Sequence, residues 1–235
     1  MMKMTHRRRL RAAAAAAGLL GLLAGCMTPA VNDPARTGPF FTPANVNGDA
    51  ALPPAVRRVV LMPLQASAAV PADSLAALDD VFAAALGREN RFEVVTLSRE
   101  ECVRRLGDES LATTATLPAR FLERLQAEFG AQAVLFVDVT TFRAYRPLRL
   151  GVRAKLAETG SGRLIWTFDN VFAADEPAVA NAARHFFLQS DRQDVPADLT
   201  RAVLQSPSRF GAYAAAATFA TLPPVKLPPA RPARR

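Results

Sequence analysis

The sequence predicts an α/β (α+β) fold in which helices cover a mixed β-sheet of about five strands, with an antiparallel hairpin in its C-terminal half. Three observations lead to this fold class. Short β-branched runs recur between residues 57 and 172, apolar positions at helical spacing separate the earlier runs, and glycine or proline closes most segments. The chain therefore combines strands that alternate with helices and strands joined by a tight turn, and a mixed sheet accommodates both.

The first half of this region alternates strands and helices. The predicted elements are a strand at 57–64, a helix at 75–86, a strand at 91–97, a helix at 98–106 and a further helical piece at 118–129. Gly87 and Gly107 are expected stops, because glycine favours the residue after a helix. Ser98 and Glu101 form a capping box, which marks the start of the helix that follows.

The second half predicts three consecutive strands and two helices. These elements are strands at 133–142, 148–157 and 163–172, and helices at 175–189 and 206–217. The first of these strands is long and apolar, which favours a central position in the sheet. In the second strand, apolar residues alternate with Arg149, Gly151, Arg153 and Lys155, so that one face is expected on a core and the other in water. The turn Thr159–Gly162 predicts a hairpin between the second and third strands.

Residues 1–25 have the composition of a cleaved secretion signal. Basic residues precede a 12-residue apolar core, which at about 1.5 Å per residue is about 18 Å long, too short for a hydrocarbon layer of ~30 Å. The tetrad Leu23–Cys26 resembles the bacterial lipobox, in which the cysteine thiol receives a diacylglyceryl group and its amine is acylated after cleavage, with palmitate expected. Cys26 is therefore the predicted lipidation site. The alternative is an ordinary secretory signal with an accidental cysteine.

The remaining chain divides into three parts. Residues 26–56 hold the lipidated cysteine and a Pro-rich stretch with six prolines, which predicts a disordered tether of at most about 100 Å. Residues 57–222 are predicted to form a single periplasmic α/β domain, and residues 223–235 a Pro/Arg-rich disordered tail. Met27 follows the cysteine instead of the aspartate that resembles an inner-membrane retention signal, which favours the outer membrane with the domain facing the periplasm.

Charge and cysteine content exclude several classes of function. The formal net charge of +8 arises at the ends of the chain, since residues 26–222 carry 20 basic and 21 acidic residues, and it gives no argument for nucleic-acid binding. With Cys26 lipidated, Cys102 is the only free thiol, which leaves no disulfide, CxxC pair or zinc ligand set. The sequence therefore predicts no metal and no cofactor.

Four segments together resemble a group of envelope proteins. They are Met62–Leu64, Asn90–Val95, Leu125–Val137 and Val152–Trp166. In their order they resemble proteins related to the curli-secretion lipoprotein CsgG, the penicillin-binding-protein activator LpoB and the N-terminal domain of the Tol-system propeller protein. In that group an "LPF"-like turn ends the first strand, an "rF.vv" strand follows, and a "G(A)d.vl.g.v" strand precedes a hairpin with a "tG.vlw" turn. The resemblance covers about residues 57–190.

The resemblance implies a tethered, non-enzymatic binding domain, so it transfers no catalytic residue. A member of the pore-forming branch needs two inserted segments, each supplying a membrane hairpin with strands of ~9–11 residues. The links between strands here are short and lack the alternating lipid-facing positions of such hairpins. A channel is therefore not expected.

The residues themselves offer no catalytic set. No G-x-S-x-G, H-E-x-x-H, Walker or G-x-G-x-x-G motif occurs in the sequence. His185 is expected to be solvated or capping, Cys102 buried and inert, and Asp138 half-exposed on the sheet beside Thr140. An enzyme would need a buried polar cluster near Asp138, Asp169 or Cys102.

One group of side chains stands out as a candidate partner-binding surface. Five basic residues fall within 13 positions that contain no acid: Arg143, Arg146, Arg149, Arg153 and Lys155. They form either a solvated strand face that discourages edge pairing, or a docking surface for an acidic partner protein or an anionic envelope polymer.

Two functional hypotheses follow from these observations. The first is a membrane-anchored, non-enzymatic periplasmic lipoprotein that binds or activates a cell-envelope machine, as an accessory of peptidoglycan synthesis or envelope assembly. The alternative is a structural or transport subunit of an export or lipid-trafficking complex, which would purify as a stoichiometric oligomer. Both hypotheses expect the membrane, through the lipid anchor, and an envelope protein as partners, with no nucleic acid and no small-molecule substrate.

Overall fold

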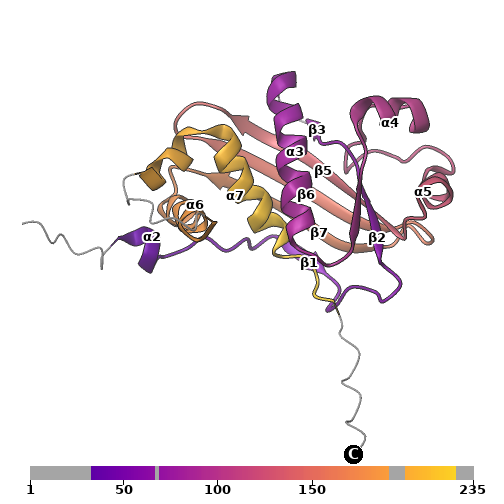
Figure 1. Cartoon of the computed structure of the whole chain (residues 1–235), viewed down its shortest axis with the longest axis horizontal. Helices are drawn as coiled ribbons and strands as arrows, with labels where there is room; N and C mark the ends of the chain where they lie inside the picture. Colours follow the sequence, from indigo (N-terminus) through magenta and orange to yellow (C-terminus); the bar gives the residue numbers. More distant parts are fainter. Residues whose placement is uncertain (1–32, 67–68, 191–198, 226–235) are drawn as a thin grey trace, which may run out of the picture.

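The computed structural model describes residues 33–66, 69–190 and 199–225 (Figure 1). Seven strands form one sheet in the order β1-β7-β6-β5-β2-β4, with β3 beside β5. The strands are β1 (Val46–Gly48), β2 (Arg58–Leu61), β3 (Gln65–Ala66), β4 (Glu93–Thr96), β5 (Ala133–Arg143), β6 (Arg149–Glu158) and β7 (Leu164–Ala173). The predicted fold class is confirmed, and β1 and β3 are additions that the sequence did not predict.

The helices include each predicted one. They are α2 (Pro34–Thr37), α3 (Ala72–Arg88), α4 (Arg99–Leu106), α5 (Phe121–Phe129), α6 (Pro177–Ser190) and α7 (Pro207–Phe219), with a 3₁₀ segment η3 (Leu199–Gln205). Ser98 caps α4 by accepting a hydrogen bond from Glu101 N, as the capping box predicts, and Gly107 ends it in a left-handed conformation with φ of 94°. Ser206 caps α7 in the same way, through Arg209 N.

The sheet is mixed because two kinds of connection build it. β2 pairs in parallel with β4 and with β5, since helices connect these strands, whereas β5, β6 and β7 pair antiparallel. The predicted hairpin between β6 and β7 is confirmed, with Leu156 opposite Trp166. The register of β5 on β6 shifts between Val139 and Thr141, which places a bulge near the end of β5.

The sheet buries both of its faces. Alternate residues of β5 enter two separate cores: Leu135 and Val137 pack with α3, α6 and α7, whereas Val134 and Phe136 pack with α4 and α5. The first core contains Trp166, and the second contains Cys102. Helices α3, α6 and α7 therefore contribute to one core and helices α4 and α5 to the other, with the sheet between the two.

The predicted tether is wrong for residues 33–56, which pack on the domain. Asp33 caps α2, the Ala35 side chain is fully buried, and β1 pairs antiparallel with β7. Leu52 and Val56 enter the first core. This stretch is ordered by short contacts with residues that are distant in the sequence. Such contacts leave no apolar periodicity, so the absence of periodicity did not indicate disorder. Residues 26–32 of the predicted tether lie outside the described residues.

The last described residues lie against the segment that precedes β2. Leu52 N donates a hydrogen bond to Pro224 O, and Leu52 forms a parallel bridge with Val225. Arg91 donates hydrogen bonds to the carbonyls of Leu222 and Pro223. The predicted C-terminal tail therefore begins with a segment that is bound to the domain; residues 226–235 lie outside the described residues. Among residues 33–66, 69–190 and 199–225, the structure contains no helix with the length and apolar character that a bilayer span requires.

Candidate functional site

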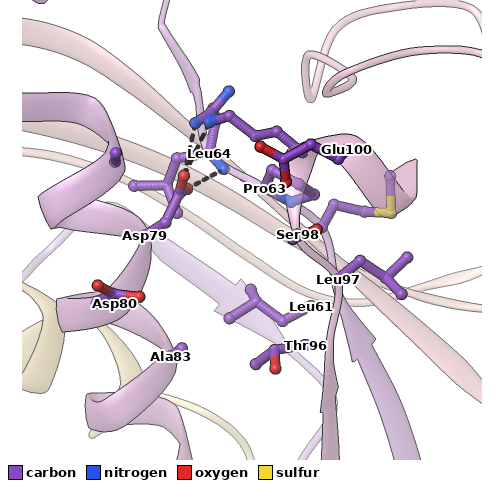
Figure 2. Close-up of a pocket in the computed structure, with 13 residues that line it drawn as sticks. Leu61, Pro63, Leu64, Asp79, Asp80, Ala83, Thr96, Leu97, Ser98 and Glu100 are labelled. Carbon is purple, nitrogen blue, oxygen red and sulfur yellow. Dashed lines mark hydrogen bonds and ion pairs between the residues drawn. The ribbon is translucent and has the colours of Figure 1, made fainter. Parts of the chain in front are cut away.

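A cavity of about 350 Å³ opens at the carboxyl ends of the parallel strands β2 and β4 (Figure 2). Three segments line it: the Leu61–Leu64 turn after β2, the exposed side of α3, and the Thr96–Glu100 link into α4. Ligands of open α/β sheets bind at this edge, because parallel strands end there and the connecting loops diverge. The place of this cavity in the fold makes it one candidate site.

Its charged side chains hold the turn after β2 in place. Asp79 Oδ1 accepts a hydrogen bond of 2.7 Å from Leu64 N, and Asp79 Oδ2 lies 2.8 Å from Arg99 Nη2. Arg99 in turn donates a 2.8 Å hydrogen bond to Leu64 O (dashed lines in Figure 2). Arg99 and Asp79 therefore clamp both polar groups of Leu64 from α4 and α3, which explains the fixed conformation of the "LPF"-like turn.

Burial raises the pKa of the Asp79 carboxyl, and the hydrogen bond from Leu64 and the charge of Arg99 oppose that shift. Both carboxylate oxygens already accept hydrogen bonds from the protein. Asp79 and Arg99 therefore form a structural ion pair in this cavity, and their polar groups are already bound to other parts of the protein.

The structure separates the five predicted partner-binding residues into two sets. Arg149 pairs with Asp175 at 2.8 Å, and Arg153 pairs with Asp169 at 2.8 Å. The hydrogen bond from Arg149 lowers the pKa of Asp175. Lys155 Nζ donates a 2.8 Å hydrogen bond to the carbonyl of Thr113, in the loop that follows α4. These three side chains are neutralised or hydrogen-bonded within the domain, and the face expected in water is partly covered.

The other two residues lie at the turn between β5 and β6. Arg143 is opposite Arg149 in the register, and Arg146 is three positions before the start of β6. Neither has an ion pair or side-chain hydrogen bond within the described residues. Tyr145 stands between them with 83% of its surface exposed. The turn therefore presents two arginines without an ion pair, of which Arg143 lies near enough to Asp175 for its charge to help lower the pKa of that carboxyl, and an exposed aromatic ring.

Asp138 differs from its prediction, because it is fully buried. Thr113 donates two hydrogen bonds to its carboxylate, from the backbone N at 2.9 Å and from Oγ1 at 2.5 Å. The loop between α4 and α5 folds over this part of the sheet, and the alternation within β5 alone could not reveal that cover. Asp138 thus fixes the loop, as a buried polar group with satisfied partners does.

Cys102 and His185 have structural surroundings. Burial raises the pKa of the Cys102 thiol to about 11, which keeps it protonated at neutral pH, in agreement with an inert thiol. His185 Nδ1 lies 2.9 Å from Ala35 O and its Nε2 lies 2.8 Å from Gln189 Nε2. A carbonyl only accepts, so Nδ1 carries the proton and Nε2 accepts from Gln189. His185 therefore holds α2 against α6.

A second cavity, of about 500 Å³, contains three arginines: Arg146 from the β5–β6 turn, Arg184 from α6 and Arg201 from η3. Arg184 is paired with Asp33 at 2.9 Å and donates a 3.0 Å hydrogen bond to Thr200 Oγ1. Sequence reasoning identified only Arg146 of this set. Asp33 followed by Pro34 has the pattern of an N-cap with proline at N1, and this pattern could have predicted α2 from the sequence. No local sequence pattern indicates that Arg184 or Arg201 lines the same cavity as Arg146.

The predicted lipidation site, Cys26, lies outside the described residues. Within residues 33–66, 69–190 and 199–225, no group of three or more His, Cys, Asp and Glu side chains is placed to hold a metal ion.

Comparison of the chain with known protein families and with curated proteins finds no match. Solved structures do show similarity. The PelC dodecamer from Paraburkholderia phytofirmans is 15% identical with a TM-score of 0.38, covering 72% of this chain and 94% of its own. Lipoprotein GNA1162 from Neisseria meningitidis is 17% identical with a TM-score of 0.37, covering 49% of this chain and 79% of its own.

The LpoB C-terminal domain from Escherichia coli is 16% identical with a TM-score of 0.35, and the match covers 53% of this chain and 85% of that domain. LpoB is one of the proteins that the sequence motifs resemble, so the resemblance recurs among solved structures. At these TM-scores the similarities leave the function to be argued from the residues of this chain.

Proposed function

We propose that this protein is a membrane-anchored, non-enzymatic periplasmic lipoprotein that binds or activates a cell-envelope machine. The observation that carries the proposal is the tetrad Leu23–Cys26 at the end of a basic and apolar signal segment. One acyl chain binds a membrane only marginally, whereas the diacylglyceryl and amide-linked chains expected at Cys26 make the attachment stable. The outer membrane is the proposed address.

The chemistry of the domain supports a binding role. Three of its titratable groups serve the fold: Asp138 binds Thr113, Asp79 binds Leu64 and Arg99, and the buried Cys102 thiol is protonated at neutral pH. Each of these groups stabilises a turn, a loop or a core. A nucleophile or general base would instead need a free lone pair facing a substrate.

The proposed docking surface is the β5–β6 turn. Arginine and tyrosine are enriched among the residues that contribute most to protein interfaces, because both offer a flat surface together with hydrogen bonds. Arg143 and Tyr145 are exposed there, and neither is engaged in an ion pair within the described residues. Arg149 and Arg153 are neutralised by ion pairs and Lys155 donates a hydrogen bond to Thr113, so these three side chains are not expected to contact the partner.

The anchor is tested by changing Cys26→Ala. The unaltered chain is expected in the membrane fraction and to carry acyl chains by mass spectrometry of its N-terminal peptide. The variant is expected to lose these acyl chains and to remain at the precursor mass, because the thiol that receives the lipid is gone. An acylated or normally processed variant would disprove lipidation at this residue.

The docking surface is tested by photocrosslinking in intact cells. A photoreactive phenylalanine analogue at Tyr145 is expected to give a discrete adduct with another envelope protein. The matched control places the same analogue at Leu164, which is 47% exposed at the start of β7. Equal adducts from both positions would contradict docking at the turn, and an adduct with a second copy of this chain would favour the structural-subunit alternative.

A further inference from the structure

The cavity of about 500 Å³ between the β5–β6 turn, α6 and η3 has an unusual charge. Arg146, Arg184 and Arg201 are among the residues that line it, and Arg184 is paired with the carboxylate of Asp33. Arg146 and Arg201 have no ion pair or side-chain hydrogen bond within the described residues. The three arginines and Asp33 together therefore carry a net charge of about +2 at neutral pH.

The rest of the lining fits a small organic anion. Asn181 and Gln205 add amide groups, while Ala174, Ala180 and Leu204 provide apolar surface. The volume is within the range of small-molecule sites, about 300–1,000 Å³. Guanidinium groups recognise planar or tetrahedral oxyanions through paired N–H donors, and phosphate is the oxyanion for which arginine clusters are commonly used.

Charge balance distinguishes a phosphate monoester from singly charged oxyanions. A phosphate monoester carries about −1.5 to −2 at neutral pH, which matches the net charge of the arginines and Asp33. A carboxylate or a phosphodiester carries a single negative charge and would leave the cluster uncompensated. We propose that the cavity formed around Arg146, Arg184 and Arg201 is a binding site for a phosphate monoester. This site goes beyond the proposed function, which assigns no ligand.

Two sources offer this chemistry in an envelope: a phosphorylated lipid headgroup and a soluble phosphorylated molecule. Asp33 is only seven positions after Cys26, so a lipid-anchored chain holds Asp33 within about 25 Å of its attachment point. Asp33 in turn touches the cavity through Arg184. The lipid source depends on the proposed anchor at Cys26, whereas the binding chemistry of the cavity does not.

The first experiment titrates glycerol 1-phosphate into the full chain in neutral detergent and measures heat by calorimetry. The double substitution R146Q/R201Q is expected to weaken binding on the order of tenfold or more, because two charge-assisted contacts are lost. The matched control R104Q/R120Q removes two arginines that are 68% and 81% exposed on the α4 and α5 side, and it is expected to bind normally. Fluorescence of the buried Trp166 checks that each variant is folded.

A third variant makes a distinct prediction. Asp33→Asn keeps an oxygen that can accept from Ala35 N and cap α2, but it removes the charge that competes for Arg184. It is expected to tighten glycerol 1-phosphate binding by a few-fold. A site in which Arg184 only stabilises the fold would show no such gain.

A second experiment distinguishes a lipid headgroup from a soluble ligand. The full chain with Cys26→Ser is mixed with phosphatidylcholine vesicles with or without phosphatidic acid. Its sedimentation with the vesicles is compared with that of the same chain carrying R146Q/R201Q. Cosedimentation that depends on both phosphatidic acid and these arginines identifies a lipid headgroup, and glycerol 1-phosphate binding alone identifies a soluble ligand. The proposal is overturned if neither probe binds, or if R146Q/R201Q binds both probes as the unaltered chain does.

Discussion

Gly151 in β6 lies against the bulge of β5. A Cβ atom at this position would clash with Thr140 Oγ1 and lie 2.9 Å from Thr141 N. The register shift between Val139 and Thr141 brings this backbone unusually close, and only a residue without a side chain fits. The sequence predicted the alternation of β6, but the need for glycine within it follows from the neighbouring strand.

Gly151→Ala is therefore expected to lower the free energy of unfolding by about 1–3 kcal/mol, because the added methyl group overpacks the junction of β5 and β6. Urea denaturation measures this change. Gly160→Ala is the control, since a Cβ at Gly160 meets no atom within 4 Å. Equal stability of the two variants would contradict the close approach at the bulge.

The sequence predicted the surroundings of some single side chains and not of others. It anticipated the cap at Ser98, which depends on neighbours in the chain, and the buried thiol of Cys102, which its place on the apolar face of α4 indicated. It placed Asp138 half in water, whereas Thr113 covers it from a loop 25 positions away. Side chains whose surroundings are local are predictable from sequence, and those covered by a distant loop are not.

Among the elements, α2 is the one whose existence depends most on distant contacts. It is four residues long, and it is held by the fully buried Ala35, the Asp33–Arg184 ion pair and the bond from His185 to Ala35 O. A helix of this length has no stability of its own in water. The long, strongly periodic helices α3 and α7 could be predicted because their apolar faces are visible in the sequence, whereas α2 has no such face.

Ala35→Arg is expected to release α2 from α6 while leaving the sheet intact, because a long charged side chain cannot enter the buried position of Ala35. Hydrogen exchange of the amides of Arg36 and Gly38, which bond within α2, is expected to accelerate strongly. Exchange in β5 and β6 is expected to stay unchanged.

Thr37→Arg provides the matched control, since Thr37 is exposed on the same helix. If both variants exchanged at the rate of the unaltered chain, burial of Ala35 would not be what holds α2 in place.

The molecule as a whole has two cores on opposite faces of one sheet. Trp166 reports on the core beneath α3 and α7, and Cys102 reports on the core beneath α4 and α5. β2 and β5 contribute alternate residues to both cores, so that loss of either core exposes the same strands. The three long central strands and their hairpin were predictable from sequence, while the short strands β1 and β3 exist only through pairing with them.

Because the cores share the sheet, urea unfolding is expected to be a single transition. Trp166 fluorescence and the reactivity of Cys102 toward a thiol reagent at pH 8 should have coincident midpoints. Burial raises the Cys102 pKa to about 11, so the native thiol stays protonated at pH 8, and unfolding returns its pKa to the ordinary range and allows reaction. Reaction of Cys102 at urea concentrations that leave Trp166 fluorescence native would show that the α4–α5 layer opens separately.

The docked segment ahead of β1 has a mechanical consequence. With Cys26 lipidated and a partner bound as proposed, tension between the anchor and the partner would reach the Asp33–Arg184 contact first, since that contact lies nearest Cys26 in the chain. β1 would carry no load until α2 had detached. Release of residues 33–45 would lengthen the connection by up to about 45 Å, with the seven strands still paired. While α2 stays docked, the domain is held close to Cys26. A pull that detaches α2 would lengthen the connection between Cys26 and β1.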